Sequence, residues 1–346
     1  MAALTSTSRI AVRAPRPGEG GAVAGLWREL WDVHESWGSY PGSKEDSAYE
    51  QVASRVDQDS RARGGNVMLG RHIHLVATLD GDLLGQVEGW VDRFGDSPLT
   101  PWTCEVRSLV VSARARGFGL GRALLDALGE AATTLAHGPT VLVAEVLEPN
   151  PAHSFYSNAG YSPVSWVARV DELDRHVSSA LSGARVAHPS DAYALALLDA
   201  SLAARRRAQG DVRFDPPRAI DATLIGALAA RLDGAWAYGP MPQELVVTDA
   251  TNTLRASTSL YVAPLDPPFL PVRRAILTRL AVDTAADPTP YLRALVPFAA
   301  HIATTWGART LEISDLSAPG TPLHRAALDA GARPWSRVVS KRHTPA

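Results

Sequence analysis

Apolar and polar residues along the first 170 positions follow strand-like and helix-like patterns in turn. Alternating or continuous apolar runs predict strands at residues 9–14, 72–79, 83–91, 105–111, 140–147 and 165–170. Apolar residues at helical spacing predict helices at 21–37, 44–61, 120–136 and 151–159. Asp80-Gly81 is a strong hairpin signal between two of the strands. The predicted order is β-α-α-β-β-β-α-β-α-β.

The same order begins again after residues 174–189, whose Ser, Gly and charged residues are typical of a linker. Helices are predicted at 192–207, 217–232, 291–306 and 322–330, and strands at 244–248, 254–262, 275–282 and 310–314. Six identical pairs are separated by 171 positions: Leu109/Leu280, Val111/Val282, His153/His324, Ala159/Ala330, Gly160/Gly331 and Pro163/Pro334. This internal repeat predicts two α/β domains, 1–175 and 176–346, each with a mixed, mostly antiparallel sheet flanked by helices.

The stretch from Arg116 to Arg122 connects a predicted strand to a predicted helix. Gly117, Gly119 and Gly121 lack Cβ atoms, so an anion can approach the backbone N–H groups at the start of the helix. Arg116 adds a positive charge, and together these features indicate a pyrophosphate site. The stretch lacks the lysine of a P-loop, and its third glycine is one position early for a dinucleotide fingerprint.

Two motifs resemble those of the GNAT acetyltransferases. One is Arg-x-x-Gly-x-Gly at Arg116, Gly119 and Gly121, and the other is the segment 150–161, with Asn150, an aromatic pair and Gly160-Tyr161. The predicted order of elements, with a hairpin before the glycine loop, is similar as well. The whole chain resembles the tandem GNAT proteins of actinobacteria, which include one from the clavulanic acid gene cluster.

The resemblance implies an acetyl-CoA site in the first half. The diphosphate is expected at Arg116 and at the N–H groups of Gly117, Phe118, Gly119, Leu120, Gly121 and Arg122. The pantetheine arm is expected along the backbone of Leu109, Val110 and Val111, where one N–H group polarises the thioester carbonyl.

Catalysis of acyl transfer also needs a proton donor for the thiolate and a proton acceptor for the amine. The resemblance implies Tyr156 as the acid; the alternative is a core aromatic beside Phe155. Glu105, on the strand that leads to the loop, is the candidate base, with Glu88 as its rival and a water relay as the default. Asn150 is expected to bind pantetheine or to cap the following helix.

The second half has lost these groups, because Arg116, Gly119 and Gly121 correspond to Asp287, Pro290 and Leu292. An aspartate repels a diphosphate and a proline has no N–H donor. We therefore expect a degenerate GNAT-like domain that covers part of the first half.

Composition limits the other function classes. The 346 residues carry a net charge of −2, which gives no bulk attraction to nucleic acid or to an anionic membrane. The single cysteine, Cys104, excludes an internal disulfide, and His72 and His74 lack further ligand spacing for a metal. No signal peptide or membrane span is predicted, so a cytoplasmic monomer or homodimer is expected.

Three functions remain open from the sequence. The first is an acetyl-CoA-dependent N-acyltransferase acting on a small-molecule amine, for example in antibiotic metabolism. The second is a protein N-acetyltransferase, and the third is an acyl-CoA-binding sensor without turnover. An aromatic acceptor pocket is expected near Trp31, His34, Trp37 and Tyr40, although core packing is the alternative for Trp31.

Overall fold

The computed structural model describes residues 10–39, 46–93, 101–175, 183–214, 219–238, 243–262, 273–283 and 287–344. The elements of the first half are β1 (Ile10–Arg13), α1 (Gly20–Ser36), α2 (Asp46–Arg63), β2 (Met68–Leu69), β3 (His72–Leu79), β4 (Asp82–Arg93), β5 (Trp102–Val111), α3 (Leu120–Ala136), β6 (Thr140–Leu147), α4 (His153–Asn158) and β7 (Ser162–Val170). Those of the second half are β8 (Ala184–Val186), α5 (Ala192–Ala208), α6 (Ala222–Tyr238), β9 (Gln243–Thr248), β10 (Leu254–Val262), β11 (Arg273–Val282), α7 (Thr289–Thr305), β12 (Ala308–Leu316), α8 (Pro322–Asp329) and β13 (Arg333–His343).

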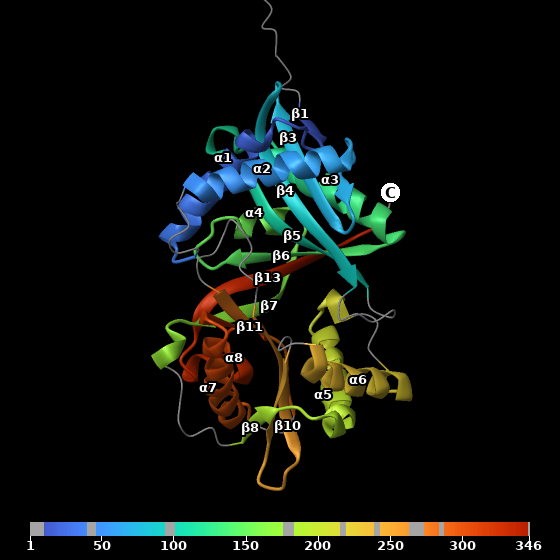
Figure 1. Cartoon of the computed structure of the whole chain (residues 1–346), viewed down its shortest axis with the longest axis vertical. Coiled ribbons are helices and arrows are strands. Elements are labelled where there is room, and N and C mark those ends of the chain that lie inside the picture. Colours follow the sequence, from blue (N-terminus) through green and yellow to red (C-terminus); the bar gives the residue numbers. More distant parts are fainter. Residues whose placement is uncertain are drawn as a thin grey trace, which may run out of the picture.

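The described strands of both halves form one continuous mixed sheet. Its order is β1-β3-β4-β5-β6-β13-β7-β12-β11-β10-β9-β8, with β2 paired to β3 off this path. The helices of the first half lie at one end of the molecule and those of the second half at the other, and β13 crosses the middle between β6 and β7 (Figure 1). The predicted class, an α/β fold whose mixed sheet is flanked by helices, is confirmed.

The centre of the sheet is built by exchange of the last strand of each half. β13 lies between β6 and β7 of the first half, and β7 lies between β13 and β12 of the second half. Trp166 on β7 pairs with Arg337 on β13, and these two residues are themselves 171 positions apart. The repeat axis therefore passes through this pair, and each half completes the sheet of the other.

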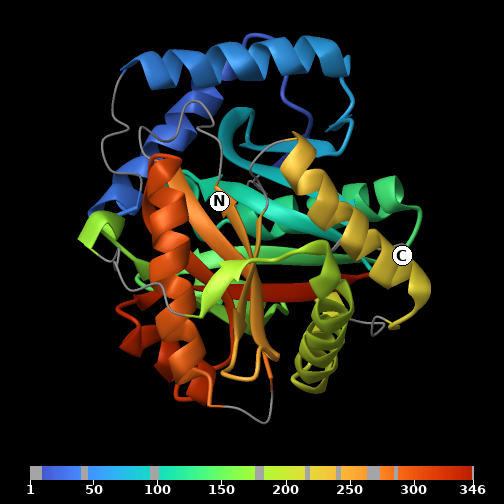
Figure 2. The same ribbon diagram turned by 60° about the horizontal axis from the view of Figure 1, so that its bottom comes forward.

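Helices cover both faces of the sheet because buried side chains alternate along its strands. On β3, Leu75 and Ala77 belong to the core under α3, whereas Val76 belongs to the core under α1 and α2. In the second half, the corresponding strands run between α5 and α7 (Figure 2).

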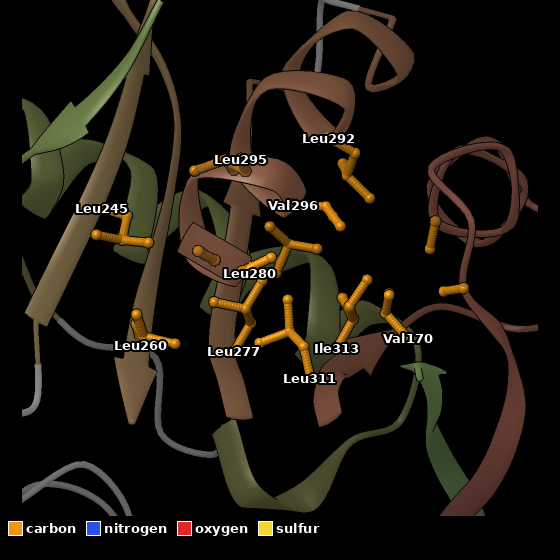
Figure 3. Close-up of a cluster of buried hydrophobic side chains, with 14 of the residues drawn as sticks. Val170, Leu245, Leu260, Leu277, Leu280, Leu292, Leu295, Val296, Leu311 and Ile313 are labelled. Atoms are coloured by element: carbon orange, nitrogen blue, oxygen red, sulfur yellow. The ribbon is translucent and has the colours of Figure 1, made fainter. Parts of the chain in front are cut away.

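The two main cores also exchange residues. Val339 of β13 is buried in the core under α3. Val170 of β7 is buried among Leu292, Val296 and Ile313 in the core under α7 (Figure 3). Full burial of one such apolar side chain contributes about 1.5–3 kcal/mol to folding, so each core depends on residues of the other half.

The elements agree with the predicted ones to within a few residues, with three exceptions, the first of which is the two-residue strand β2. No strand was predicted at β8 within the expected linker, and none was predicted after Gly331, where β13 lies. The Asp80-Gly81 hairpin is confirmed, since both residues adopt positive φ (53° and 98°) between paired strands.

Candidate functional site

β5 and β6 run parallel at first and then separate. Their pairing extends from Trp102/Thr140 to Val106/Ala144, after which β5 continues to Val111 and β6 to Leu147. From Arg107 onwards, the β6-facing edge of β5 pairs with no described strand. Its backbone groups are therefore available to an extended ligand.

A bulge on β5 lies where the strands separate. Ser108 adopts a positive φ of 44°, and the register with β4 shifts between Gln86 and Glu88. The Gln86 amide donates a hydrogen bond to the Ser108 carbonyl oxygen at 3.1 Å, which fixes the bulge. Beyond it, Val110 and Val111 pair with β4, while Leu109 is half-buried.

The glycine loop turns the chain from β5 into α3. Gly117 and Gly119 have φ of 87° and 89°, a region that side chains with a Cβ rarely adopt. Gly119 is the N-cap of α3, and no described side chain caps this end. The first N–H groups of α3, from Leu120 to Arg122, therefore remain available to an anion.

The side chains of the loop have different surroundings. Arg116 is exposed, with its Nε 3.4 Å from the Val111 carbonyl oxygen. Phe118 is 53% exposed, whereas Leu120 is buried in the core. The Arg122 guanidinium pairs with Asp126 at 3.1 Å and donates to the Asn158 carbonyl oxygen, so its contribution to an anion site is its backbone N–H group.

Gly121 brings the loop and α4 together. A Cβ at this position would lie 3.2 Å from the ring of Phe155 and 3.7 Å from Val111. The glycine therefore permits α3, β5 and α4 to meet at one point, which the loop pattern alone did not show.

Tyr156, the predicted acid, is buried on α4. Its ring packs edge-on against Phe155 and Tyr161, with centroid distances of 5.2 and 5.3 Å. Burial raises the pKa of Tyr156 well above its usual range, so the phenol stays protonated and can donate a proton. None of the described residues hydrogen-bonds to its hydroxyl.

Asn150 forms a turn before α4 rather than a cap on it, because the N-cap residue of α4 is Ala152 and no described side chain caps that end. Its Oδ1 accepts a hydrogen bond from the Ala152 N–H at 2.9 Å, just before α4 begins.

The two carboxylates considered as bases differ in environment. Glu105 is exposed and pairs with Arg107 at 2.7 Å. Glu88 is buried; burial acts to raise its pKa, but a hydrogen bond with His72 and the charges of His74 and Arg55 outweigh this and lower the pKa to about 2. Glu88 is therefore held ionised and weakly basic.

A third carboxylate, Glu145, was missed by the sequence analysis. It is the first residue of β6 beyond the last β5–β6 pair, and its carboxylate accepts a hydrogen bond from the Ser336 hydroxyl of β13 at 2.6 Å. The available signal was a single charged residue within the otherwise uncharged strand Thr140–Leu147.

The predicted aromatic acceptor pocket is only partly covered by the described residues. Trp31 is buried in the core under α1 and α2, which agrees with core packing. His34 and Trp37 are in ring contact at 5.3 Å at the end of α1. Tyr40 lies outside the described residues.

The equivalent place in the second half is filled by the chain itself. β11 and β12 separate after Leu277/Ile313, and the bulge residue Arg279, which corresponds to Ser108, also has positive φ (57°). There the Asp315 carboxylate accepts the Arg279 backbone N–H at 3.1 Å. The first half has Ala144 at the position of Asp315.

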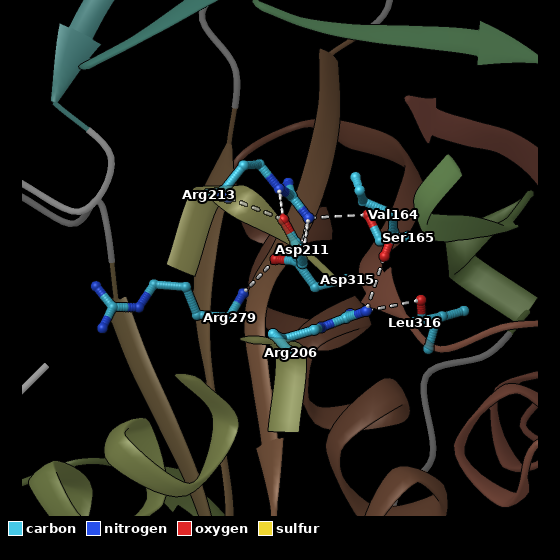
Figure 4. A network of polar contacts seen from close by, with 8 residues as sticks. All are labelled: Val164, Ser165, Arg206, Asp211, Arg213, Arg279, Asp315 and Leu316. Atoms are coloured by element: carbon cyan, nitrogen blue, oxygen red, sulfur yellow. Dashed lines mark hydrogen bonds and ion pairs between the residues drawn. The ribbon is translucent and has the colours of Figure 1, made fainter. Parts of the chain in front are cut away.

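A buried polar network holds Asp315 in this place (Figure 4). The Arg213 guanidinium binds Asp315 at 3.1 Å, Asp211 at 2.8 Å and the Ser165 hydroxyl at 3.1 Å. Burial acts to lower the pKa of Arg213, but Asp315 and Asp211 outweigh it and raise that pKa. The network occupies the point where the strands separate.

A carboxylate also lies at the start of α7. The Asp287 carboxylate accepts the Thr289 N–H at 3.0 Å, where α3 leaves its N–H groups open. At the place where the first half is expected to bind a diphosphate, the second half therefore carries the carboxylate of Asp287.

Residues 27–161 match the model of the acetyltransferase (GNAT) family. This match covers most of the first half of the chain. Comparison with curated protein sequences gives no match. No helix in the described part of the chain is long and apolar enough to cross a membrane, and the described residues include no cluster of three or more His, Cys, Asp or Glu suited to a metal.

Two of the solved structures with a similar fold match this chain over nearly its whole length. A GCN5-related N-acetyltransferase from Sphaerobacter thermophilus has a TM-score of 0.57 at 17% identity, with 97% of this chain and 96% of that chain covered. A tandem GNAT protein from the clavulanic acid biosynthesis pathway has a TM-score of 0.50 at 16% identity, with 98% and 100% covered. The tandem GNAT fold therefore extends over both halves.

Proposed function

We propose that the first half transfers an acyl group, acetyl in the first instance, from CoA to a primary amine of a small molecule in the cytoplasm. The observation that carries this proposal is the contrast between two equivalent places in one chain. In the first half, the bulge on β5 and the start of α3 are open, whereas Asp315 and Asp287 fill their counterparts.

The proposed roles come from the resemblance to GNAT acetyltransferases, and the geometry of the first half is compatible with them. The N–H groups of residues 117–122 and the Arg116 guanidinium bind the diphosphate. The open edge of β5 at residues 109–111 pairs with the pantetheine arm, and a backbone N–H group polarises the thioester carbonyl. Asn150 fixes the turn before α4, from which Tyr156 protonates the leaving thiolate.

The acceptor is expected on the face of the sheet opposite α3, where Glu105 and Glu145 lie. Direct attack by the amine in a ternary complex then needs a proton acceptor on this face, and Glu105 is the candidate from the sequence. Because one fold neighbour comes from the clavulanic acid pathway, amines of secondary metabolism are the first class to test.

The test has two stages. Native mass spectrometry of the full chain with acetyl-, succinyl- and longer acyl-CoAs should show one acyl-CoA per chain, and CoA release should then follow addition of an amine from a panel of small primary amines. Two equivalents of similar affinity would contradict the assignment to the first half. If acyl-CoA binds tightly, no amine releases CoA and a peptide is acetylated, the protein is a protein acetyltransferase. If acyl-CoA binds tightly and no acceptor is acetylated, it is a sensor.

A further inference from the structure

Glu145 lies on the face of the sheet where the proposed function expects the acceptor amine, just beyond the last β5–β6 pair. Its neighbours Ala144 and Val146 point into the core under α3, so the Glu145 side chain is on the opposite, acceptor face of the sheet. It follows directly after the last β5–β6 pair, level with the part of β5 that continues unpaired towards the bulge at Ser108. The residue keeps access to solvent, while its carboxylate is partly buried at the hydrogen bond with Ser336.

Groups from both halves surround this carboxylate. Ser336 on β13 donates a hydrogen bond to it at 2.6 Å. Glu312 on β12 is 4% exposed and pairs with Arg274 on β11 at 3.3 Å. Glu105 on β5 is the nearest carboxylate of the first half, and its own partner is Arg107.

These surroundings make Glu145 the best-matched base on the acceptor face. Burial of the carboxylate is the largest effect, and together with the negative charge of Glu312 it raises the pKa of Glu145 to about 7, against the opposing effects of Arg274 and of the Ser336 hydrogen bond. A general base is most effective when its pKa is close to the working pH. Glu88, with a pKa of about 2, does not meet this requirement.

We propose that the carboxylate of Glu145 accepts the proton of the acceptor ammonium, and that the second half tunes this carboxylate through Ser336 and Glu312. This role rests on the proposed acyltransferase function. It gives the degenerate half a task in the reaction, because β13 and β12 supply the groups that contact or face the base.

The reaction transfers the acyl group from sulfur to nitrogen and passes protons through Glu145 and Tyr156. The ammonium gives one proton to the Glu145 carboxylate, and the neutral amine forms a nitrogen–carbon bond with the thioester carbonyl. When the carbon–sulfur bond breaks, the sulfur takes the Tyr156 hydroxyl proton, and Tyr156 regains a proton from the new amide nitrogen. Glu145 finally releases its proton to solvent, so the net products are the amide, CoA thiol and one proton.

The test uses the full chain with acetyl-CoA and whichever panel amine gives the fastest CoA release. Glu145→Gln should lower kcat/KM about 100- to 10,000-fold, with acetyl-CoA affinity unchanged. In wild type, kcat/KM should rise with pH through about 7, as Glu145 ionises, and this limb should vanish in the variant. Glu130→Gln, an exposed change on α3, controls for the loss of a negative charge.

Two variants of the second half should shift the rise of kcat/KM with pH in opposite directions. Glu312→Gln removes a nearby negative charge, so it lowers the pKa of Glu145 and moves the limb to lower pH. Ser336→Ala removes a donor that favours the ionised form, so it raises that pKa and moves the limb to higher pH. Carboxyl-carbon NMR should show the same changes in the pKa of Glu145. The resonance that titrates near pH 7 in wild type should be absent from Glu145→Gln.

The outcomes distinguish the role of Glu145 from the acyltransferase function itself. If Glu145→Gln keeps the wild-type rate and pH limb, or if Glu105→Gln costs more, the role of Glu145 is wrong while the acyltransferase function stands. If wild type binds acetyl-CoA but no amine releases CoA, the proposed function fails and the role of Glu145 fails with it.

Discussion

At the scale of single residues, Gly119 distinguishes an anion site from an ordinary turn. Its positive φ suits glycine, and it leaves the N–H groups at the start of α3 without a capping side chain. Gly119→Asp should abolish acetyl-CoA binding, measured by calorimetry, because the new carboxylate takes the diphosphate position. Gly65→Asp is the matched control, since Gly65 has nearly the same φ (88°) with no atom within 4 Å of an added Cβ.

The two variants together separate binding from backbone strain. Both introduce an aspartate at positive φ, so both should lower the melting temperature by a similar amount. If Gly119→Asp binds acetyl-CoA as tightly as Gly65→Asp does, the loop is only a turn.

Tyr156 tests whether a buried aromatic also performs chemistry. Tyr156→Phe removes a hydroxyl and little volume, so acetyl-CoA affinity should be nearly unchanged. A donor used only in the transition state lowers kcat and kcat/KM together, here by about 100-fold or more. Steady-state kinetics with a panel amine measure this, and a wild-type rate would leave Tyr156 with a packing role beside Phe155 and Tyr161.

At the scale of elements, the close approach of α3 to the sheet depends on Gly89 of β4. A Cβ there would lie 2.6 Å from Leu128 of α3 and 2.8 Å from the Cys104 sulfur of β5, both of them buried. Gly89→Ala should therefore lower the free energy of unfolding by about 1–3 kcal/mol, measured by urea denaturation.

Gly25 in α1 provides the opposite control. It lies within a helix with no atom within 4 Å of an added Cβ, so Gly25→Ala should be neutral or stabilising by up to about 1 kcal/mol. Equal effects of the two substitutions would show that α3 can move away from β4 without cost.

At the scale of the whole molecule, β13 joins the halves. It pairs with β6 from Ser336/Leu147 to His343/Thr140 and with β7 on its other side, and it contributes Val339 to the core under α3. Without it, β6 and β7 would each have an unpaired edge in the middle of the sheet. A chain that ends at Ala332 should therefore aggregate or lose cooperative melting in both halves.

Circular dichroism melting and acetyl-CoA binding test this dependence, with removal of residues 344–346 alone as the control. A chain lacking residues 333–346 that melts cooperatively and binds acetyl-CoA with full affinity would show that the second half has no structural role in the first. That result would also contradict the tuning of Glu145 by Ser336.

The domain division proposed from the repeat, 1–175 and 176–346, describes the order of the sequence rather than two separable bodies. The offset of 171 positions holds in the structure down to the bulges at Ser108 and Arg279. The sheet nevertheless runs without interruption through both halves.

The sequence by itself determined the features that are local in the chain. The glycine loop, the helix periodicity and the Asp80-Gly81 hairpin each depend on residues within a few positions of one another. Short-range backbone and patterning rules act over that range, so these features could be predicted without a structure.

Only the tertiary structure decided the features that join distant residues. β13 is rich in arginine and was not predicted as a strand, because its burial comes from insertion between β6 and β7. Asp315 lies just beyond the predicted strand 310–314, and only the fold places its carboxylate between the Arg213 guanidinium and the Arg279 N–H group. The pKa of Glu145 is raised to about 7 by burial and by the charge of Glu312, which is 167 positions away in the sequence. Burial and through-space charge depend on distance in the folded chain, and sequence separation carries no record of that distance.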